Sequence, residues 1–182
     1  ALAVGALLTY LTNWPIGAFT GTIMGVVLAL GLKSDSAAHI DNDEDLDLST
    51  NTLGKYHRDG DPFHTDIARL RASGITGEFF SIYVSGSTLR TGGSMRRAMD
   101  LIDVTYRATE KYPRQLTQCT KAAEIRQAKL AGKMCVLMGI EGGYAIENSL
   151  SALREFYRLG VRYMTLTHNV THDWADAHRD TP

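Results

Sequence analysis

The sequence has little net charge, little cysteine and, over its first 32 residues, no charged residue at all. Its 182 residues include 19 Lys and Arg against 20 Asp and Glu, which gives a formal net charge of −1. A balance so close to neutral gives no electrostatic reason to expect nucleic acid as a partner. Internal repeats and low-complexity tracts are also absent from the sequence, so a repeat architecture is not indicated.

Only two cysteines occur, Cys119 and Cys135, and their spacing matches no metal-binding or redox motif. Cys135 lies inside an apolar run, where a free thiol behaves as a small hydrophobic side chain. We therefore expect a buried free thiol there rather than a redox or metal centre.

The uncharged stretch at residues 1–33 predicts a membrane anchor. Residues 16–32 are apolar apart from two threonines, close to the roughly 20 residues that span a bilayer, and Trp14 suits the interfacial region. A signal-peptide core and a buried helix of a soluble protein are the alternatives. Three glycines at four-residue spacing favour a packed membrane helix: Gly17, Gly21 and Gly25.

Residues 34–182 have the composition of a soluble domain in which helix and strand patterns alternate. An acidic loop over 34–61, with one short strand near 37–41, comes first. Such alternation indicates βαβ units, a parallel sheet and an α/β fold. We expect helices over 64–74, 94–112, 120–131 and 146–159, and strands over 78–84, 116–119, 134–140 and 161–167.

Two of these helices show an apolar face at helical spacing. We expect the following side chains to point inward: Met95, Met99, Ile102 and Tyr106 in the first, and Leu150, Leu153, Phe156 and Tyr157 in the second.

A carboxylate closes the strand predicted at Met134–Ile140, a short apolar run typical of a strand buried on both faces. Glu141 follows this run directly and is followed by Gly142 and Gly143, which permit a sharp turn. Burying a carboxylate is costly, so it requires a cation, a set of donors or a metal. A glutamate exposed at the start of a loop is the alternative.

Three predicted strand ends carry groups that bind metals or transfer protons: His39 and Asp41, Glu141, and His168. In a parallel α/β sheet the carboxyl ends of the strands lie at one pole, where ligands bind. Imidazole with carboxylate suits zinc or a similar divalent metal. A single strand-end histidine can instead be a hydrogen-bonded structural residue. The other histidines are expected in loops: His57, His64, His172 and His178.

These residues, with the stretches around them, resemble the membrane dipeptidase family (renal dipeptidase, peptidase family M19). The matching stretches follow the order of the family and include the His-Ile-Asp, Gly-Ile-Glu-Gly-Gly and Leu-Thr-His-Asn motifs. They are residues 39–41, 64–75, 79–84, 139–143, 148–150, 159–169 and 174–176.

The resemblance implies a (β/α)₈ TIM-like barrel with two zinc ions and a dipeptidase activity. In that case His39 and Asp41 bind one zinc, Glu141 bridges both, and His168 contacts the substrate and helps to stabilise the tetrahedral intermediate. A metal-bridged hydroxide would attack the peptide bond of a dipeptide. The family accepts some dipeptides with a D-residue at the carboxyl end. Tyr144 stands where the family often has His.

A (β/α)₈ barrel takes about 250 residues, and about 150 follow the apolar stretch. The chain therefore corresponds to the N-terminal half of the barrel, residues 34–182, behind an anchor at residues 1–33. The family's remaining zinc-binding histidines, acid–base Asp and carboxylate-binding Arg lie in the other half. We expect this half alone to be inactive, and its open sheet edges to favour a homodimer.

The expected protein is anchored in the membrane, with its catalytic domain on the extracytoplasmic side. Two other readings remain open: a catalytically inactive, membrane-tethered binding or assembly relative, and another metal-dependent amidohydrolase. Zinc content distinguishes the first of these from the dipeptidase, and hydrolysis of a dipeptide panel distinguishes the second.

Overall fold

Strand β3 (Met134–Glu141) is the centre of the sheet, and all of its residues are buried. The computed structural model describes residues 49–55 and 65–178 of the chain. A continuous apolar run is what a strand covered on both faces requires, because no side of it meets water. The strand predicted at 134–140 is therefore confirmed, with Glu141 as its last residue.

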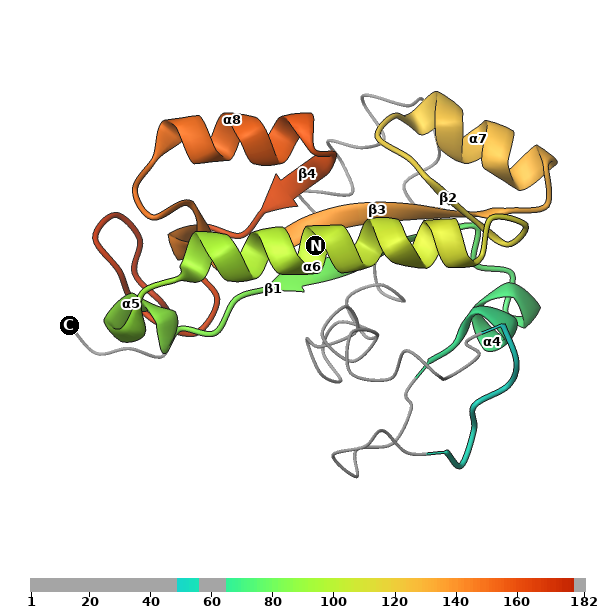
Figure 1. Cartoon of the computed structure of the whole chain (residues 1–182), viewed down its shortest axis with the longest axis horizontal. Coiled ribbons are helices and arrows are strands. Elements are labelled where there is room, and N and C mark those ends of the chain that lie inside the picture. The colour runs from blue at the N-terminus through green and yellow to red at the C-terminus, as the bar shows by residue number, and fades with distance from the viewer. Residues whose placement is uncertain (1–48, 56–64, 179–182) are drawn as a thin grey trace.

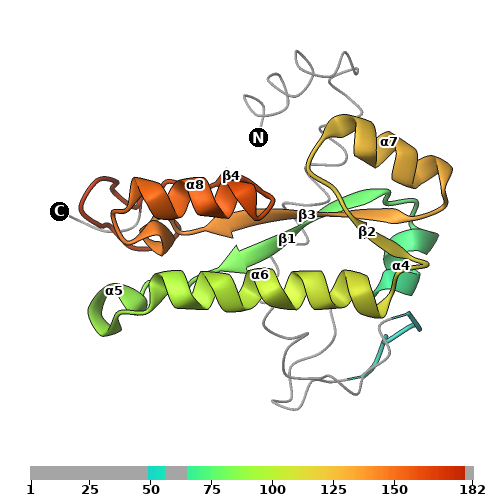
Figure 2. The ribbon, with the colours of Figure 1, turned by 45° about the horizontal axis from the view of Figure 1, so that its top comes forward.

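Three further strands run parallel to β3 (Figures 1 and 2). Strand β1 (Gly77–Tyr83) pairs along one edge over the full length of β3. On the other edge, β2 (Leu116–Gln118) pairs with the first half of β3 and β4 (Val161–Met164) with the second half. The predicted α/β fold with a parallel sheet is confirmed, although β4 is shorter than the predicted 161–167.

Helix α6 (Ser94–Lys111) crosses the sheet in front of β1 and β3 (Figure 1). Its inward face differs from the prediction: Ile102 is buried and Tyr106 packs on the core, but Met99 is 42% exposed. The stripe facing the sheet recurs at three- and four-residue intervals and includes small residues, so the helix approaches the strands closely. Its members are Ala98, Leu101, Ile102, Thr105 and Ala108.

The other helices are shorter: α4 (Ile67–Ala72), α5 (Thr88–Thr91), α7 (Ala122–Leu130), the 3₁₀ helix η1 (Gly143–Ile146) and α8 (Leu150–Arg158). Helix α4 begins later than predicted because the carboxylate of its N-cap residue, Asp66, accepts a hydrogen bond from Arg69 N. Helix α7 begins at Ala122 rather than at the predicted residue 120, and Lys121 is its N-cap. The Thr120 backbone N–H instead donates to Glu124 Oε2 at 2.6 Å.

The inward face predicted for residues 146–159 is partly wrong. Ser149 Oγ accepts a hydrogen bond from Ala152 N, so α8 begins at Leu150 rather than at Ile146. Phe156 is buried, but Leu150 is 64% and Tyr157 62% exposed. The buried stripe of α8 is centred on Ala152 and Phe156, and Leu150 and Tyr157 lie outside it.

Cys119 and Cys135 form a disulfide, so the expected free thiol is wrong. Cys119 follows β2 directly, and its backbone N–H donates to Val136 O at 2.9 Å. This parallel pairing places the two Cα atoms 5.5 Å apart, a normal separation for a disulfide. Since the loop between the cysteines contains α7, their proximity depends on tertiary pairing rather than on a local motif.

The sheet has two different faces. One, with Ile82, Met138 and Ile140, packs against α6 and α8 in an apolar core. The opposite face, here called the Glu141 face, carries alternate residues of β1 and β3, since paired residues of parallel strands point to the same side. It consists of Phe79, Ser81 and Tyr83 with Leu137, Gly139 and Glu141. Residues of α7 pack on its amino-terminal end, around Leu137.

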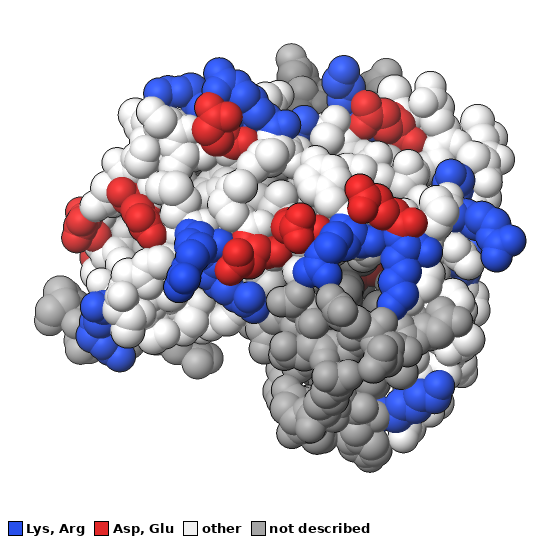
Figure 3. Space-filling model, viewed as in Figure 1, with Lys and Arg blue, Asp and Glu red and all other residues white. Residues whose placement is uncertain are grey.

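Charged side chains of both signs are interspersed over the face that Figure 3 shows. Arg107 Nε on α6 lies 3.0 Å from Asp103 Oδ2, and Arg158 pairs with Glu155 on α8. Exposed pairs of this kind contribute little to stability. The fold is therefore held mainly by its buried apolar clusters and by the disulfide.

Several predictions lie outside the described residues: the anchor at 1–33, the strand near 37–41, His39, Asp41, His57 and His64. Within residues 49–55 and 65–178, the helices are all too short or too polar to cross a bilayer.

Candidate functional site

Glu141 is the last residue of β3, at the carboxyl end of the sheet and opposite Tyr83 of β1. Its side chain is only 8% exposed. Burial raises the pKa of the Glu141 carboxyl above its ordinary value, and the nearby Ser81 hydroxyl partly offsets that rise. A carboxylate this well buried requires a compensating partner if it is to stay charged.

The partner that the structure provides is His168, in the segment after β4. Its Nδ1 atom lies 3.7 Å from Glu141 Oε2, too far for a normal hydrogen bond. The edge of the His168 ring packs against the Tyr83 ring, with centroids 5.2 Å apart. Burial lowers the pKa of His168, so the ring is neutral at pH 7 and does not supply the missing positive charge.

Ser81 is a second buried polar residue on the Glu141 face. Its Oγ atom is buried and has no hydrogen-bond partner of normal geometry among the described residues. Buried hydroxyls almost always have a partner, so an orphan beside a buried carboxylate indicates a place for a further polar group.

Two further tyrosines surround the carboxylate. Burial, with smaller contributions from Tyr83 and Glu141, raises the pKa of Tyr144 to about 12. Burial and the charge of Glu141 also raise the pKa of Tyr163. Both phenols therefore remain protonated at neutral pH. The Tyr163 ring lies directly over Gly139, where a Cβ would be 2.1 Å from the ring, so only glycine fits at this position.

The segments after β1, β3 and β4 interlock next to Glu141. The Gly142 backbone N–H donates to Thr165 Oγ1 at 2.8 Å, which joins the segment after β3 to the one after β4. Tyr144 OH donates to Val84 O at 2.6 Å, which joins it to the end of β1. These bonds hold the loop that follows Glu141 on both sides.

His172 is held as part of this loop packing. Its Nε2 atom lies 2.9 Å from Leu166 O, and its ring makes edge contacts with Tyr144 and Trp174. His178 is exposed in the last described turn. Both positions agree with the expectation that these histidines belong to loops.

Of the predicted site residues, the structure therefore brings together Glu141 and His168, while His39 and Asp41 lie outside the described residues. In the described part of the chain no group of three or more His, Cys, Asp or Glu could hold a metal ion. The buried Glu141 carboxylate nevertheless suits a divalent cation that takes its other ligands from elsewhere, and His168 and Ser81 lie beside it.

The sequence did not lead us to predict Ser81, Tyr83 or Tyr163 as residues of the site. The first two could have been found, because Tyr83 ends the predicted strand 78–84 and Ser81 points to the same side two residues earlier. Tyr163 could not, because its position depends on the register shift at Met138 and Gly139 where β4 joins β3.

A family model described as membrane dipeptidase (peptidase family M19) matches residues 34–182. Among solved structures, the probable dipeptidase PvdM from Pseudomonas aeruginosa is similar, with a TM-score of 0.57 and 18% identity over 77% of this chain and 39% of that one. Dipeptidase AC, a metallopeptidase of family M19, has a TM-score of 0.54 and 21% identity over 78% of this chain and 40% of that one.

An amidohydrolase from Pseudomonas aeruginosa is also similar, with a TM-score of 0.50 and 21% identity over 57% of this chain and 30% of that one. At these identities the likeness shows the fold alone. This chain spans at most 40% of the length of the three structures.

Proposed function

The chain belongs to the membrane dipeptidase family, peptidase family M19, and from this premise we propose that it provides the amino-terminal part of a metal-dependent dipeptidase site. The observation that supports this most strongly is the Glu141 carboxylate. It is buried at the carboxyl end of β3, and the His168 ring beside it lies 3.7 Å away with a pKa that burial lowers, so this ring does not balance the negative charge.

We assign Glu141 as a metal ligand, together with His39 and Asp41 at the end of the short strand that the sequence predicts near residues 37–41. Zinc is the metal we propose, with two ions in the complete site, because imidazole and carboxylate together suit it. A bound divalent metal would polarise the substrate carbonyl and lower the pKa of water. Ser81, next to Glu141, is placed to donate a hydrogen bond that fixes the carboxylate in its binding orientation.

We assign His168 to the substrate rather than to the metal. The Tyr83 ring holds the imidazole on one side, so its orientation is set before a substrate arrives. A neutral imidazole can donate a hydrogen bond to the peptide oxygen that gains negative charge during hydrolysis. The Tyr163 phenol, kept protonated by burial, is a second donor close to Glu141.

The rest of the site would come from the part of the barrel that this chain does not contain, so we propose that residues 34–182 alone are inactive. We also propose that residues 1–33 anchor the protein in a membrane, with the enzyme on the extracytoplasmic side. The Cys119–Cys135 disulfide supports that location, because disulfides persist in oxidising compartments. The other edge of β4, which pairs with no strand of the described residues, would allow a homodimer.

The test uses the full-length protein, assayed for bound metal and for hydrolysis of a panel of dipeptides that includes D-residues at the carboxyl end. We expect close to two zinc ions and hydrolysis that a chelator removes. A protein without metal or activity would instead be a binding or assembly relative. Bound metal with no hydrolysis of any dipeptide would indicate a different amidohydrolase.

The role of His168 is tested by His168→Ala. Losing one hydrogen-bond donor to the developing charge should lower kcat on the order of 100-fold while the metal stays bound. Metal content measured beside kcat decides the outcome, since loss of zinc in this variant would make His168 a ligand.

A further inference from the structure

A strained turn follows η1, six residues after Glu141. Glu147 and Asn148 have φ angles of 47° and 59°, and they are the only non-glycine residues with positive φ in the part of the chain that the structure describes. The left-handed conformation costs roughly 1–2 kcal/mol for a residue with a side chain, although Asn tolerates it better than most. Such strain persists where the surroundings hold the chain in place.

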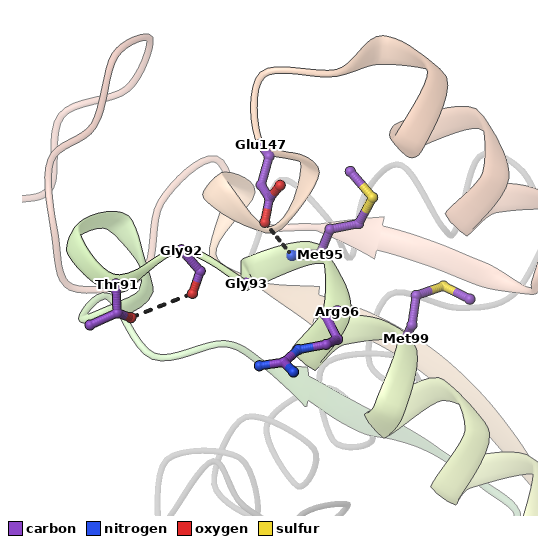
Figure 4. Close-up of a pocket in the computed structure, with 7 residues that line it drawn as sticks. All are labelled: Thr91, Gly92, Gly93, Met95, Arg96, Met99 and Glu147. Carbon is purple, nitrogen blue, oxygen red and sulfur yellow. Dashed lines mark hydrogen bonds between the residues drawn. The ribbon is translucent and has the colours of Figure 1, made fainter.

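The Glu147 side chain makes the first of two anchoring contacts. Its Oε1 atom accepts a hydrogen bond of 2.9 Å from Met95 N, in the first turn of α6 (Figure 4). The N-cap residue of α6 is Gly93, which has no side chain to accept hydrogen bonds from the free backbone N–H groups of the first turn. Glu147 therefore caps α6 from 52 residues away, and it joins the segment after β3 to the segment after β1.

The Asn148 side chain makes the second contact. Its Nδ2 atom donates to Asp173 Oδ2 at 2.5 Å. Asp173 lies at the tip of a short hairpin in which the backbones of His172 and Ala175 bond to each other at 3.0 and 3.3 Å. This hairpin belongs to the segment after β4, the same segment that carries His168.

The two side chains of the turn therefore contact two different segments: Glu147 bonds to the segment after β1, and Asn148 bonds to the segment after β4. Little regular structure holds His168, because β4 ends at Met164 and the chain continues as a loop. The Thr165 backbone N–H donates to Ile140 O, and further hydrogen bonds from Gly142 to Thr165 and from Asn148 to Asp173 tie this loop to the segment after β3. Close packing adds to them, since a Cβ on Gly143 would lie 2.3 Å from Leu166 O.

We propose that the Glu147–Asn148 turn is a positioning element for the reaction: it holds the loop after β4 so that His168 faces Glu141. This inference rests on the proposed function. Neither side chain contacts Glu141 or His168, so the turn acts through the loop and not on the substrate.

Removing the Asn148–Asp173 bond allows an effect on the position of the loop to be measured separately from an effect on the stability of the fold. Both side chains are exposed, so this bond adds little to the free energy of unfolding. Its loss should therefore change where the loop lies more than whether the protein folds.

The experiment first removes the Asn148–Asp173 hydrogen bond in the full-length protein and then restores it with the donor and the acceptor exchanged. Asn148→Asp sets two carboxylates against each other while keeping a residue that tolerates the left-handed conformation. Asp173→Asn in the same chain restores the bond with donor and acceptor exchanged. We expect Asn148→Asp to lower kcat on the order of tenfold with unchanged metal content, and the double variant to return to within about twofold of wild type.

Amide hydrogen exchange of residues 165–178 provides a measurement that does not depend on activity. Exchange should be faster in Asn148→Asp and return to the wild-type rate in the double variant. Unchanged exchange in Asn148→Asp, or no recovery in the double variant, overturns the positioning role. Faster exchange with an unchanged kcat overturns its connection to the reaction. A wild-type protein that hydrolyses no dipeptide refutes the proposed function, and exchange alone then decides whether the turn holds the loop.

Discussion

At its amino-terminal end, strand β3 is joined to the end of β2 by the Cys119–Cys135 disulfide, and α7 packs on the Glu141 face around Leu137. At its carboxyl end, the same strand carries a buried carboxylate, a nearby orphan hydroxyl and a neutral imidazole. On the Glu141 face, the amino-terminal end is crosslinked and apolar, while the carboxyl end contains groups that are costly to bury; the buried Glu78 lies on the opposite face. In β/α folds this division separates stability at the amino-terminal pole from chemistry at the carboxyl pole.

The largest expected effect is at the carboxyl end. Glu141→Gln removes the negative charge from the proposed metal site while keeping the shape of the side chain, so turnover should fall by about 1,000-fold or more and metal content should drop. Steady-state kinetics and metal analysis of the full-length protein measure both. Wild-type turnover in this variant would remove Glu141 from the site.

The matched control for that variant is Glu78→Gln, which alters a second buried glutamate, on the opposite face of the sheet. Glu78 lies on β1 among apolar neighbours, and we expect its substitution to leave turnover and metal content unchanged. A drop in metal content in both variants would show that loss of a buried glutamate on either face disturbs the metal, and that Glu141 is not specifically a ligand.

The next effect is at the amino-terminal end. Replacing Cys119 and Cys135 together by Ser should lower the free energy of unfolding by about 3 kcal/mol, because their disulfide closes a loop of 16 residues. Metal content should not change. Urea unfolding of the wild-type protein with and without a reductant is the parallel measurement, and equal stability under both conditions would contradict a structural role for the bond.

Glu78 itself should make stability depend on pH. Burial raises its pKa to about 7, so the folded state binds this proton more tightly than the unfolded state does. Stability should therefore decrease as pH rises from about 4.5 to about 7, by about 2–3 kcal/mol. Glu78→Gln should remove this decrease and be more stable than wild type at pH 8. Two parallel stability curves between pH 5 and pH 8 would show that the Glu78 pKa is not raised.

The smallest effect compares two glycines on the same face of the sheet. In Gly139→Ala the new Cβ would overlap the Tyr163 ring, and we expect a cost of about 1–2 kcal/mol with lower kcat. At Gly77, near the amino-terminal end, a Cβ meets its nearest atom at 3.4 Å, so Gly77→Ala should cost less. Thermal unfolding of the two variants gives the comparison, and equal costs would show that Tyr163 adjusts freely.

Much of the fold was predictable from local patterns. The run at residues 134–140 is apolar throughout, and the helix over 94–112 repeats at helical spacing and stops before Pro113, so both elements were found within a residue or two. The face of α8 was misplaced because the stripe that faces the core is centred on Ala152 and Phe156, four residues apart, and Leu150 and Tyr157 lie outside it.

The candidate site was predictable where it depends on strand ends. Glu141 ends β3 and His168 lies in the loop after β4, and neighbouring parallel strands bring such residues to one pole. The disulfide and Tyr163 depend instead on how β2 and β4 divide one edge of β3 between them. That division is set by tertiary packing and has no signature in the local sequence.

The most direct test locates the metal. Crystals of the full-length protein grown with zinc, and measured at the zinc absorption edge, should show an anomalous peak about 2.0–2.2 Å from a Glu141 carboxylate oxygen, with His39 and Asp41 on the same ion. Absence of a peak at the carboxyl end of β3, or a peak that Glu141 does not reach, would contradict the proposed site.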